Sequence, residues 1–189
     1  MKLALADTAT GHRLLSTAGF RVSKRRVFEA NTIVDTARGT LRRSGRLLRI
    51  REAGRLGILT YKGPAAIGKY KDREELELEV SDPRKLSKIL SRLDFAPKFR
   101  YEKYRTEYRR PGEAGTAMLD ETPIGVYLEL EGAPAWIDRN ARRLGFAESD
   151  FSTASYYGLY AAYCREHKLP VTHMTFQGQE TGVTSQETE

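Results

Sequence analysis

The chain has 189 residues, 40% of them hydrophobic, which is enough for one domain of ordinary size with its own core. Lys and Arg outnumber Asp and Glu by 32 to 25, so the formal net charge of +7 attracts anions such as nucleic acid, anionic lipid or small phosphorylated molecules. The single cysteine, Cys164, excludes an internal disulfide framework. No apolar run reaches the roughly 18 residues of a membrane span and no signal peptide is recognisable, so we expect a cytoplasmic protein without a membrane partner.

The first half of the chain predicts a short helix followed by strands. Asp7 is a suitable N-cap for a helix over 8–18, which the strand-like stub "MKLALA" precedes. Strand-like runs follow at 21–34, 46–53, 56–62 and 72–80, with a helical turn over 36–43 after the first of them. The glycine-containing segment "EAGRLG" joins the two middle runs, which predicts a β-hairpin.

The second half also contains predicted strands and helices in a similar order. "DPRKLSKILSRL" predicts a helix, with Asp82 as N-cap and Pro83 at the first helical position. Strands are expected at 98–109, 115–121 and 125–131, and helices near 134–144 and 151–167. This order predicts an α+β fold in which helices cover the outside of a closed or strongly curved antiparallel sheet. We expect a single domain over 1–168 and a disordered polar tail over 169–189.

Several predicted strands alternate charged and bulky residues. Because side chains two positions apart share a face of a strand, Leu76, Leu78 and Val80 should pack together, opposite the charged residues of the same strand. The charged positions are Arg49 and Arg51, Lys62, Arg73, Glu75 and Glu77, Lys103 and Arg105, and Glu129 and Glu131. A sheet with one solvated face explains any single strand. It explains less well why the signs are segregated strand by strand.

Those faces would form a binding site if the sheet closed with them inside. Enclosed charges are costly to desolvate unless they pair or bind ligands. Paired carboxylates suit Mg²⁺ or Mn²⁺, and guanidinium groups hold phosphate through two parallel hydrogen bonds. The pattern therefore predicts a water-filled tunnel for metal ions and phosphate oxygens.

Seven segments, in order, resemble a known family. They are "FEANTIVDT" (28–36), "LLRIRE" (47–52), "LTYKGP" (59–64), "REELE" (73–77), "EKYR" (102–105), "LDETPIGVYLELEG" (119–132) and "ASYYGLY" (154–160). The chain resembles, over about residues 2–165, the CYTH domain family, or triphosphate tunnel metalloenzymes. This family takes in class IV adenylate cyclases, thiamine triphosphatases and inorganic triphosphatases. The middle segments look closer to bacterial proteins labelled class IV adenylate cyclase than to animal thiamine triphosphatases.

The resemblance implies an eight-stranded antiparallel β-tunnel, closed as a barrel, with a triphosphate and Mg²⁺ or Mn²⁺ inside. The triphosphate would be held by Arg49, Arg51, Lys62, Arg73, Lys103, Arg105 and Ser155. The metal would be held by Glu75, Glu77, Asp120, Glu129 and Glu131. Lys2, Lys62 and Arg73 would be the catalytic side chains, and Glu29 and Asn31 are further tunnel candidates.

Three functions follow as hypotheses. The first is metal-dependent hydrolysis of an inorganic or organic triphosphate, a small-molecule substrate, by a monomer or homodimer. The second is conversion of ATP to cyclic AMP and pyrophosphate, because the same residues would serve both reactions. The third is a non-catalytic module that binds polyphosphate or nucleotide. Nucleic acid is not the partner we expect, because the basic runs at 23–26, 42–43 and 142–143 are separated and lack interleaved aromatic residues.

The sequence departs from the family at its first strand. The family begins with Glu-x-Glu-x-Lys, and here only Lys2 and the residue before it fit that motif. We read this as a start codon placed too late, because "MKLALAD" continues in register as the first strand. Without both glutamates the metal site would be incomplete, so we expect weak or no activity from the 189-residue form.

Overall fold

The computed structural model describes residues 1–54, 56–66, 68 and 73–176. Its strands are β1 (Lys2–Leu5), β2 (Arg21–Thr36), β3 (Leu47–Ala53), β4 (Leu56–Lys62), β5 (Glu75–Val80), β6 (Phe95–Arg109), β7 (Thr116–Thr122) and β8 (Gly125–Glu131). Its helices are α1 (Thr8–Thr17), α2 (Thr40–Arg43), α3 (Pro83–Arg92), α4 (Pro134–Arg143) and α5 (Tyr156–Glu166), with a 3₁₀ turn at Glu148–Asp150. The α+β class and the antiparallel pairing are as expected.

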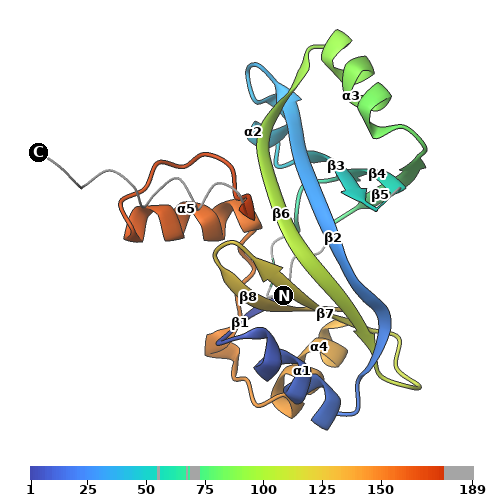
Figure 1. The fold of residues 1–189 in the computed structure, drawn as a ribbon, viewed down its shortest axis with the longest axis vertical. Helices are drawn as coiled ribbons and strands as arrows, with labels where there is room; N and C mark the ends of the chain where they lie inside the picture. Colours follow the sequence, from blue (N-terminus) through green and yellow to red (C-terminus); the bar gives the residue numbers. More distant parts are fainter. Residues whose placement is uncertain (55, 67, 69–72, 177–189) are drawn as a thin grey trace, which may run out of the picture.

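Two long strands form the centre of the sheet. β2 and β6, of 16 and 15 residues, run side by side through the length of the molecule (Figure 1). β3, β4 and β5 extend the sheet from the 29–34 part of β2, whereas β7, β8 and β1 extend it from the 104–109 part of β6. Charged side chains from both extensions meet over the middle of β2 and β6, so the two extensions curve toward one common face.

The sheet is open, which corrects the expected closed barrel. Its strand order is β1-β8-β7-β6-β2-β3-β4-β5, so β1 and β5 are the two edges, and no ladder joins them within the described part of the chain. The physical reason lies in β1: all four of its residues pair with β8, and none reaches β5. What we expected as a tunnel is therefore a deeply curved sheet with one open side.

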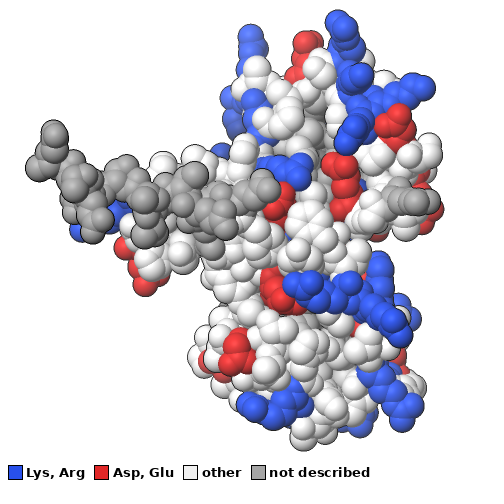
Figure 2. Space-filling model, in the orientation of Figure 1, with Lys and Arg blue, Asp and Glu red and all other residues white. Residues whose placement is uncertain are grey.

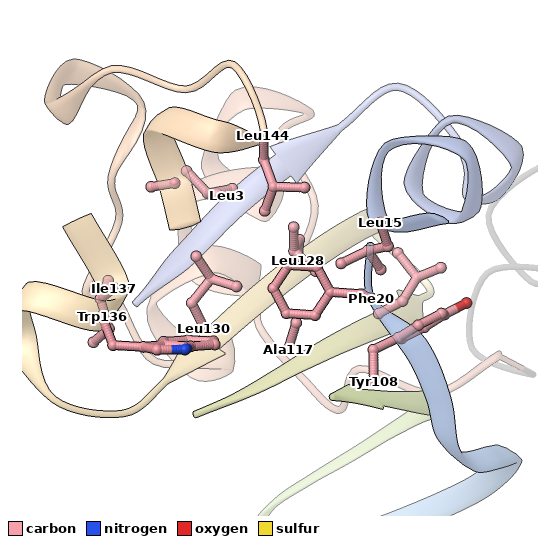
Figure 3. Packing of buried hydrophobic residues seen from close by; sticks show 12 residues of the cluster. Leu3, Leu15, Phe20, Tyr108, Ala117, Leu128, Leu130, Trp136, Ile137 and Leu144 are labelled. Carbon is pink, nitrogen blue, oxygen red and sulfur yellow. The ribbon is translucent and has the colours of Figure 1, made fainter. Parts of the chain in front are cut away.

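The main apolar core lies outside the curved sheet, beneath α1 and α4. Leu3, Leu128 and Leu130 have no exposed surface and pack with Leu15 of α1 and Trp136 of α4 (Figure 3). Full burial of each leucine is worth about 1.5–3 kcal/mol. Figure 3 shows the Trp136 ring lying flat beside β8. Gly115 gives the ring room there, since a Cβ at position 115 would lie 2.3 Å from it. This core fixes β1, β7 and β8 as a rigid platform.

Two element predictions need correction. The last helix begins at Tyr156 rather than at 151, because the Ser155 hydroxyl accepts a hydrogen bond from the Gly158 amide at 3.1 Å and caps it. Leu76 and Leu78, expected to pack, are 59% and 64% exposed. They lie on the edge strand β5, and α3 packs mainly against β3 and β6 instead. The predicted strand start at 72 lies outside the described residues.

The expected disordered tail is partly ordered. Met174 has no exposed surface, its amide donates to the Arg100 carbonyl at 3.0 Å, and its carbonyl accepts from the Glu102 amide at 2.8 Å. The physical reason is that β7 pairs only with residues 104–109 of β6, which leaves the preceding edge of β6 open to another segment. Residues 177–189 lie outside the described part of the chain.

Within the described residues, no helix has both the length and the apolar character needed to cross a membrane. Cys164, on α5, is fully buried and carries a free thiol, as expected of a small core residue.

Candidate anion-binding site

Alternate residues of the two central strands face the concave side of the sheet. β2 pairs with β3 on one side and β6 on the other, so Asn31 lies between Arg51 and Tyr101. Glu29, two residues earlier and on the same face, lies beside Lys103. The period of two that the sequence showed is therefore what brings charges from three strands together.

The tightest cluster is built on Asp120 of β7. Its carboxylate accepts from Lys103 Nζ at 2.8 Å and from two nitrogens of Arg105, both at 2.6 Å. Arg105 also donates to Glu129 of β8 at 2.5 Å. All four side chains are buried, so these ion pairs are only weakly screened by solvent. Removing any one member would leave its buried partners undercompensated.

A looser cluster lies on β3 and β4. Arg49 donates to Thr60 Oγ1 at 3.1 Å and to Glu77 Oε1 at 3.4 Å, and it reaches the Tyr101 hydroxyl at 3.4 Å. Arg51 is 3.8 Å from Glu29 and 3.4 Å from the Asn31 side-chain oxygen. These long contacts leave the two guanidinium groups able to exchange partners.

The rim of the site toward β5 carries a third group of charges. Lys62 Nζ lies 2.6 Å from Glu75, and Arg73 lies 3.6 Å from the same carboxylate. Glu75 and Glu77 are both exposed, because β5 is an edge strand. Their pairing is therefore weaker than that of the buried Asp120 cluster.

Lys2 and Tyr156 complete the opposite rim. Lys2 Nζ lies 3.1 Å from Glu129 and donates to the Ala154 carbonyl at 3.1 Å. The Tyr156 hydroxyl, at the start of α5, donates to Asp120 at 2.5 Å. Tyr156 belongs to the family-like segment 154–160, but sequence reasoning assigned it no partner and missed Thr60. Only the even spacing of Thr60 and Lys62 along β4 could have pointed to the threonine.

The basic surroundings alter the acidity of several groups. Burial alone would raise the pKa of the Glu129 carboxyl, but Lys2 and Arg105 hold that pKa well below its usual range. Burial would likewise raise the pKa of Glu29, and Lys103 and Arg105 lower it overall. Both carboxylates therefore remain ionised at neutral pH.

Two further side chains of the site have shifted pKa values. Burial lowers the pKa of the Lys62 ammonium group, although Glu75 opposes that effect. Burial acts to raise the pKa of the Tyr101 phenol, but Arg49 and Lys103 more than offset it and the pKa is lowered. The cations thus favour negative charge at Tyr101 and Glu29, whereas burial and the Asp120 carboxylate raise the pKa of the Tyr156 phenol.

Three buried polar atoms at this site have no hydrogen-bond partner among the described residues. They are Glu29 Oε2, Asn31 Nδ2 and Arg49 Nε. Buried polar atoms are almost always satisfied by protein or water, so unmet atoms mark where a ligand or ordered water belongs. Two of the three are donors, on Asn31 and Arg49, and they suit the oxygens of an anion.

The carboxylates do not form a metal site by themselves. Within the described residues, no group of three His, Cys, Asp or Glu side chains could hold a metal ion. Asp120 and Glu129 are occupied by lysine and arginine partners, and Glu131 is exposed at the end of β8. The protein groups present therefore do not fit a resident, carboxylate-bound Mg²⁺ or Mn²⁺.

Most of the residues singled out from the sequence lie on this face. The ion-paired members are Lys2, Glu29, Arg49, Arg51, Lys62, Arg73, Glu75, Glu77, Lys103, Arg105, Asp120 and Glu129. Asn31 joins them through Arg51. Ser155 instead caps α5 and is exposed, and Glu131 joins none of these pairs. Sets of seven basic and five acidic side chains thus share the site.

The comparisons with known proteins are consistent with this arrangement. The family model described as the CYTH domain matches residues 1–148. A Methanocaldococcus jannaschii protein named "Putative adenylate cyclase" is 30% identical over 132 residues, which is 69% of this chain and 74% of that protein.

Solved structures share the fold at low sequence identity. A Pyrococcus horikoshii protein aligns with a TM-score of 0.70 and 23% identity, covering 86% of this chain and 99% of its own. A Hippeastrum protein aligns with a TM-score of 0.63 and 21% identity, covering 86% and 94%. The Hippeastrum structure is described as that of a "Putative adenylyl cyclase" that reveals a dominant triphosphatase activity. At these identities the likeness shows the fold alone.

Proposed function

This chain belongs to the CYTH domain family, and we propose that it binds a triphosphate on the concave face of its sheet and transfers the terminal phosphoryl group to water. The observation that carries the proposal is the convergence of seven basic side chains on one face, against five carboxylates. A polyphosphate chain is the small anion that can use so many cations at once.

The lengths of the ion pairs divide the basic residues into two groups. Arg105 and Lys103 are held tightly by Asp120, at 2.6 and 2.8 Å, and form the fixed floor of the site. Arg49, Arg51 and Arg73 have carboxylate partners at 3.4–3.8 Å, longer than a good charged hydrogen bond. The loosely held guanidinium groups are the ones that can turn to phosphate oxygens without breaking a strong contact.

The protein's contribution to the reaction is positioning and charge stabilisation. Phosphoryl transfer to water needs little covalent chemistry from a protein, and fixed cations stabilise the charge that develops on the leaving phosphate. Lys62, Arg73 and Lys2 lie on the two rims, where they can contact the terminal phosphates. Glu29 Oε2 is ionised, lies 3.6 Å from Lys103 Nζ and has no hydrogen-bond partner among the described residues, so it is the carboxylate oxygen available to orient the attacking water.

The expected Mg²⁺ or Mn²⁺ enters this proposal as part of the substrate. The described carboxylates offer no three-ligand site, so we infer that the ion arrives as a metal–triphosphate complex, bound by phosphate oxygens. The excess of basic over acidic side chains neutralises only part of a triphosphate, and a divalent cation on the substrate restores the balance.

A direct test is phosphate release from tripolyphosphate with Mg²⁺ or Mn²⁺. Arg49→Ala should lower kcat/KM by about 10²–10³-fold, the usual loss when one fixed donor to a developing charge is removed. Arg142→Ala is the matched control, because Arg142 is an exposed arginine on α4. Equal turnover in the two variants would defeat the assignment of the site.

Cyclisation of ATP is the second candidate, and the name of the Methanocaldococcus jannaschii relative favours it. The ribose 3′-hydroxyl would attack the α-phosphorus, forming cyclic AMP and releasing pyrophosphate. An assay with tripolyphosphate, thiamine triphosphate and ATP separates the two reactions if phosphate and cyclic AMP are measured separately. Cyclic AMP as the main product from ATP, with little phosphate from any substrate, would overturn the triphosphatase proposal in favour of this one.

A further inference from the structure

The segment Thr172–Phe176, hereafter the C-terminal segment, lies beside β6 and beyond the residues matched by the family model. Met174 pairs in parallel with Tyr101, through the two backbone hydrogen bonds to Arg100 and Glu102. The Phe176 amide donates to the Glu102 carboxylate at 3.2 Å. The segment therefore acts as a short added strand on the part of β6 that β7 does not cover.

The side chains of the C-terminal segment pack into the aromatic cluster next to the site. Met174 is fully buried with Phe99, Tyr101 and Tyr156. The rings of Tyr101 and Tyr156 stack at 5.6 Å. Phe176 lies 5.3 Å from Tyr104, ring to ring. Met174 thus fixes the Tyr101 side chain on a side where the sheet itself provides no neighbour.

Tyr101 connects this cluster to the anion-binding site. Its hydroxyl lies 3.4 Å from Arg49 Nη1, and its ring is only 7% exposed. Arg49 is also the residue whose Nε has no partner among the described residues. The position of the Tyr101 side chain therefore affects the direction of the Arg49 guanidinium group. It affects the direction of the Nε donor in the same way.

We propose that the C-terminal segment is a positioning element for the triphosphate site: Met174 fixes Tyr101, and the Tyr101 hydroxyl orients Arg49 toward the substrate phosphates. The proposal rests on the proposed function. It adds the C-terminal segment, which lies outside the residues 1–148 that the family model matches. Orientation matters because a guanidinium group binds phosphate through two donors in a fixed plane, and a misdirected plane loses one of them.

The binding test uses full-length variants and tripolyphosphate with Mg²⁺, measured by calorimetry. Tyr101→Phe keeps the ring and removes the hydroxyl, and it should weaken binding about three- to tenfold, the range for one hydrogen bond. Met174→Ala should weaken binding to a similar extent, and Met174→Leu should restore it. The double variant Tyr101→Phe, Met174→Ala should bind no more weakly than the weaker single variant, because both changes remove the same contact.

Leu144→Ala is the matched control for lost packing. Leu144 is buried in the core under α4, away from Tyr101. This control should lower the melting temperature as Met174→Ala does, with unchanged binding. The proposal would be overturned if Met174→Ala bound tripolyphosphate like the wild type. It would also be overturned if the binding losses of Met174→Ala and Tyr101→Phe added fully in the double variant.

A second measurement needs no substrate, so it separates this inference from the proposed function. In protein labelled with ¹³Cζ-tyrosine, the Tyr101 signal is the one missing from Tyr101→Phe. The cations beside Tyr101 lower the pKa of its phenol against the effect of burial, so its titration should fall below that of free tyrosine. In Met174→Ala the titration should move up toward the free value, whereas Met174→Leu should not change it.

An unmoved Tyr101 titration in Met174→Ala would contradict the inference even if tripolyphosphate binds. If the wild type does not bind tripolyphosphate, the proposed function fails and this titration alone decides whether the segment positions Tyr101.

Discussion

Asp120 has no exposed surface and accepts hydrogen bonds from Lys103, Arg105 and Tyr156. Oδ2 accepts three of these hydrogen bonds and Oδ1 accepts one, from Arg105 Nε. The sequence motif suggested a metal ligand; in the structure Asp120 fixes the directions of Lys103 and Arg105, the two cations that we propose bind phosphate.

Replacing Asp120 by Asn should destabilise the fold strongly. Loss of the carboxylate leaves Lys103 and Arg105 buried and undercompensated, which costs about 3–5 kcal/mol in the free energy of unfolding. Urea denaturation measures this difference. Glu121→Gln is the control, since Glu121 pairs with the exposed Arg26 and its loss should cost less than about 1 kcal/mol. Similar losses for the two variants would mean that the buried cluster contributes no more than a surface pair.

At the scale of elements, Glu113 attaches α4 to the turn between β6 and β7. Its carboxylate accepts from Asn140 at 3.0 Å, Arg110 at 2.5 Å and Arg143 at 3.3 Å. Burial would raise the pKa of Glu113, but the hydrogen bonds from Asn140 and Arg110 lower it to about 2. Because α4 covers the core beneath β7 and β8, this one carboxylate supports the platform that carries Asp120 and Glu129.

The Glu113 contact should make the fold sensitive to acid. A carboxylate with a depressed folded-state pKa stabilises the protein above its unfolded pKa, and this contribution is lost as the pH falls through the folded value. The stability of the wild type should therefore fall between about pH 4.5 and 2. Glu113→Gln should be less stable than the wild type at neutral pH and should lose less on acidification. Urea midpoints measured across this range check the result, and parallel curves for the two proteins would contradict it.

At the scale of the whole molecule, the positive charge is unevenly distributed. Basic side chains gather at the end that bears α2 and α3, among them Arg42, Arg43, Lys85 and Lys88 (Figure 2). A field of this kind attracts polyanions without choosing among them. The concave face, where cations alternate with carboxylates, is the part that can discriminate.

Reversing three exposed charges should separate these two effects. The combined change of Arg42, Arg43 and Arg142 to Glu removes most of the net charge of +7. We expect the variant to leave a heparin column at clearly lower salt than the wild type, with kcat for tripolyphosphate unchanged. Arg49→Ala should show the opposite pattern. A loss of kcat in the three-residue variant would place part of the catalytic site on the outer surface.

Removal of the divalent cation is a further test at this scale. With EDTA, phosphate release from tripolyphosphate should stop, because under our proposal the metal arrives on the substrate and neutralises the phosphate charge that the basic side chains do not. Binding of tripolyphosphate should persist and weaken, since the arginines remain. Calorimetry with and without Mg²⁺ distinguishes this outcome from complete loss of binding, which would point to a metal held by the protein.

Much of the site could be predicted because its information is local. The alternation that placed Arg49 with Arg51, and Lys103 with Arg105, is a property of any strand, and the structure confirms that all four face the same side. Asp35 is of a residue type that caps helices and directly precedes the expected helical turn, and its oxygens accept from the Leu41 and Arg42 amides, both at 3.0 Å. Local rules were less successful at β5, where edge position rather than pattern decides the exposure of Leu76.

The sequence by itself determined the fold class, the family, and the set of charged residues that share one face, because period-two alternation and ordered motifs need no knowledge of distant contacts. Only the tertiary structure decided that the sheet stays open between β1 and β5, that Asp120 forms ion pairs with Lys103 and Arg105, and that Met174 is buried against Tyr101. The physical reason is that each of these depends on residues far apart in the chain. Met174 and Tyr101 meet only because β7 is too short to cover the whole edge of β6.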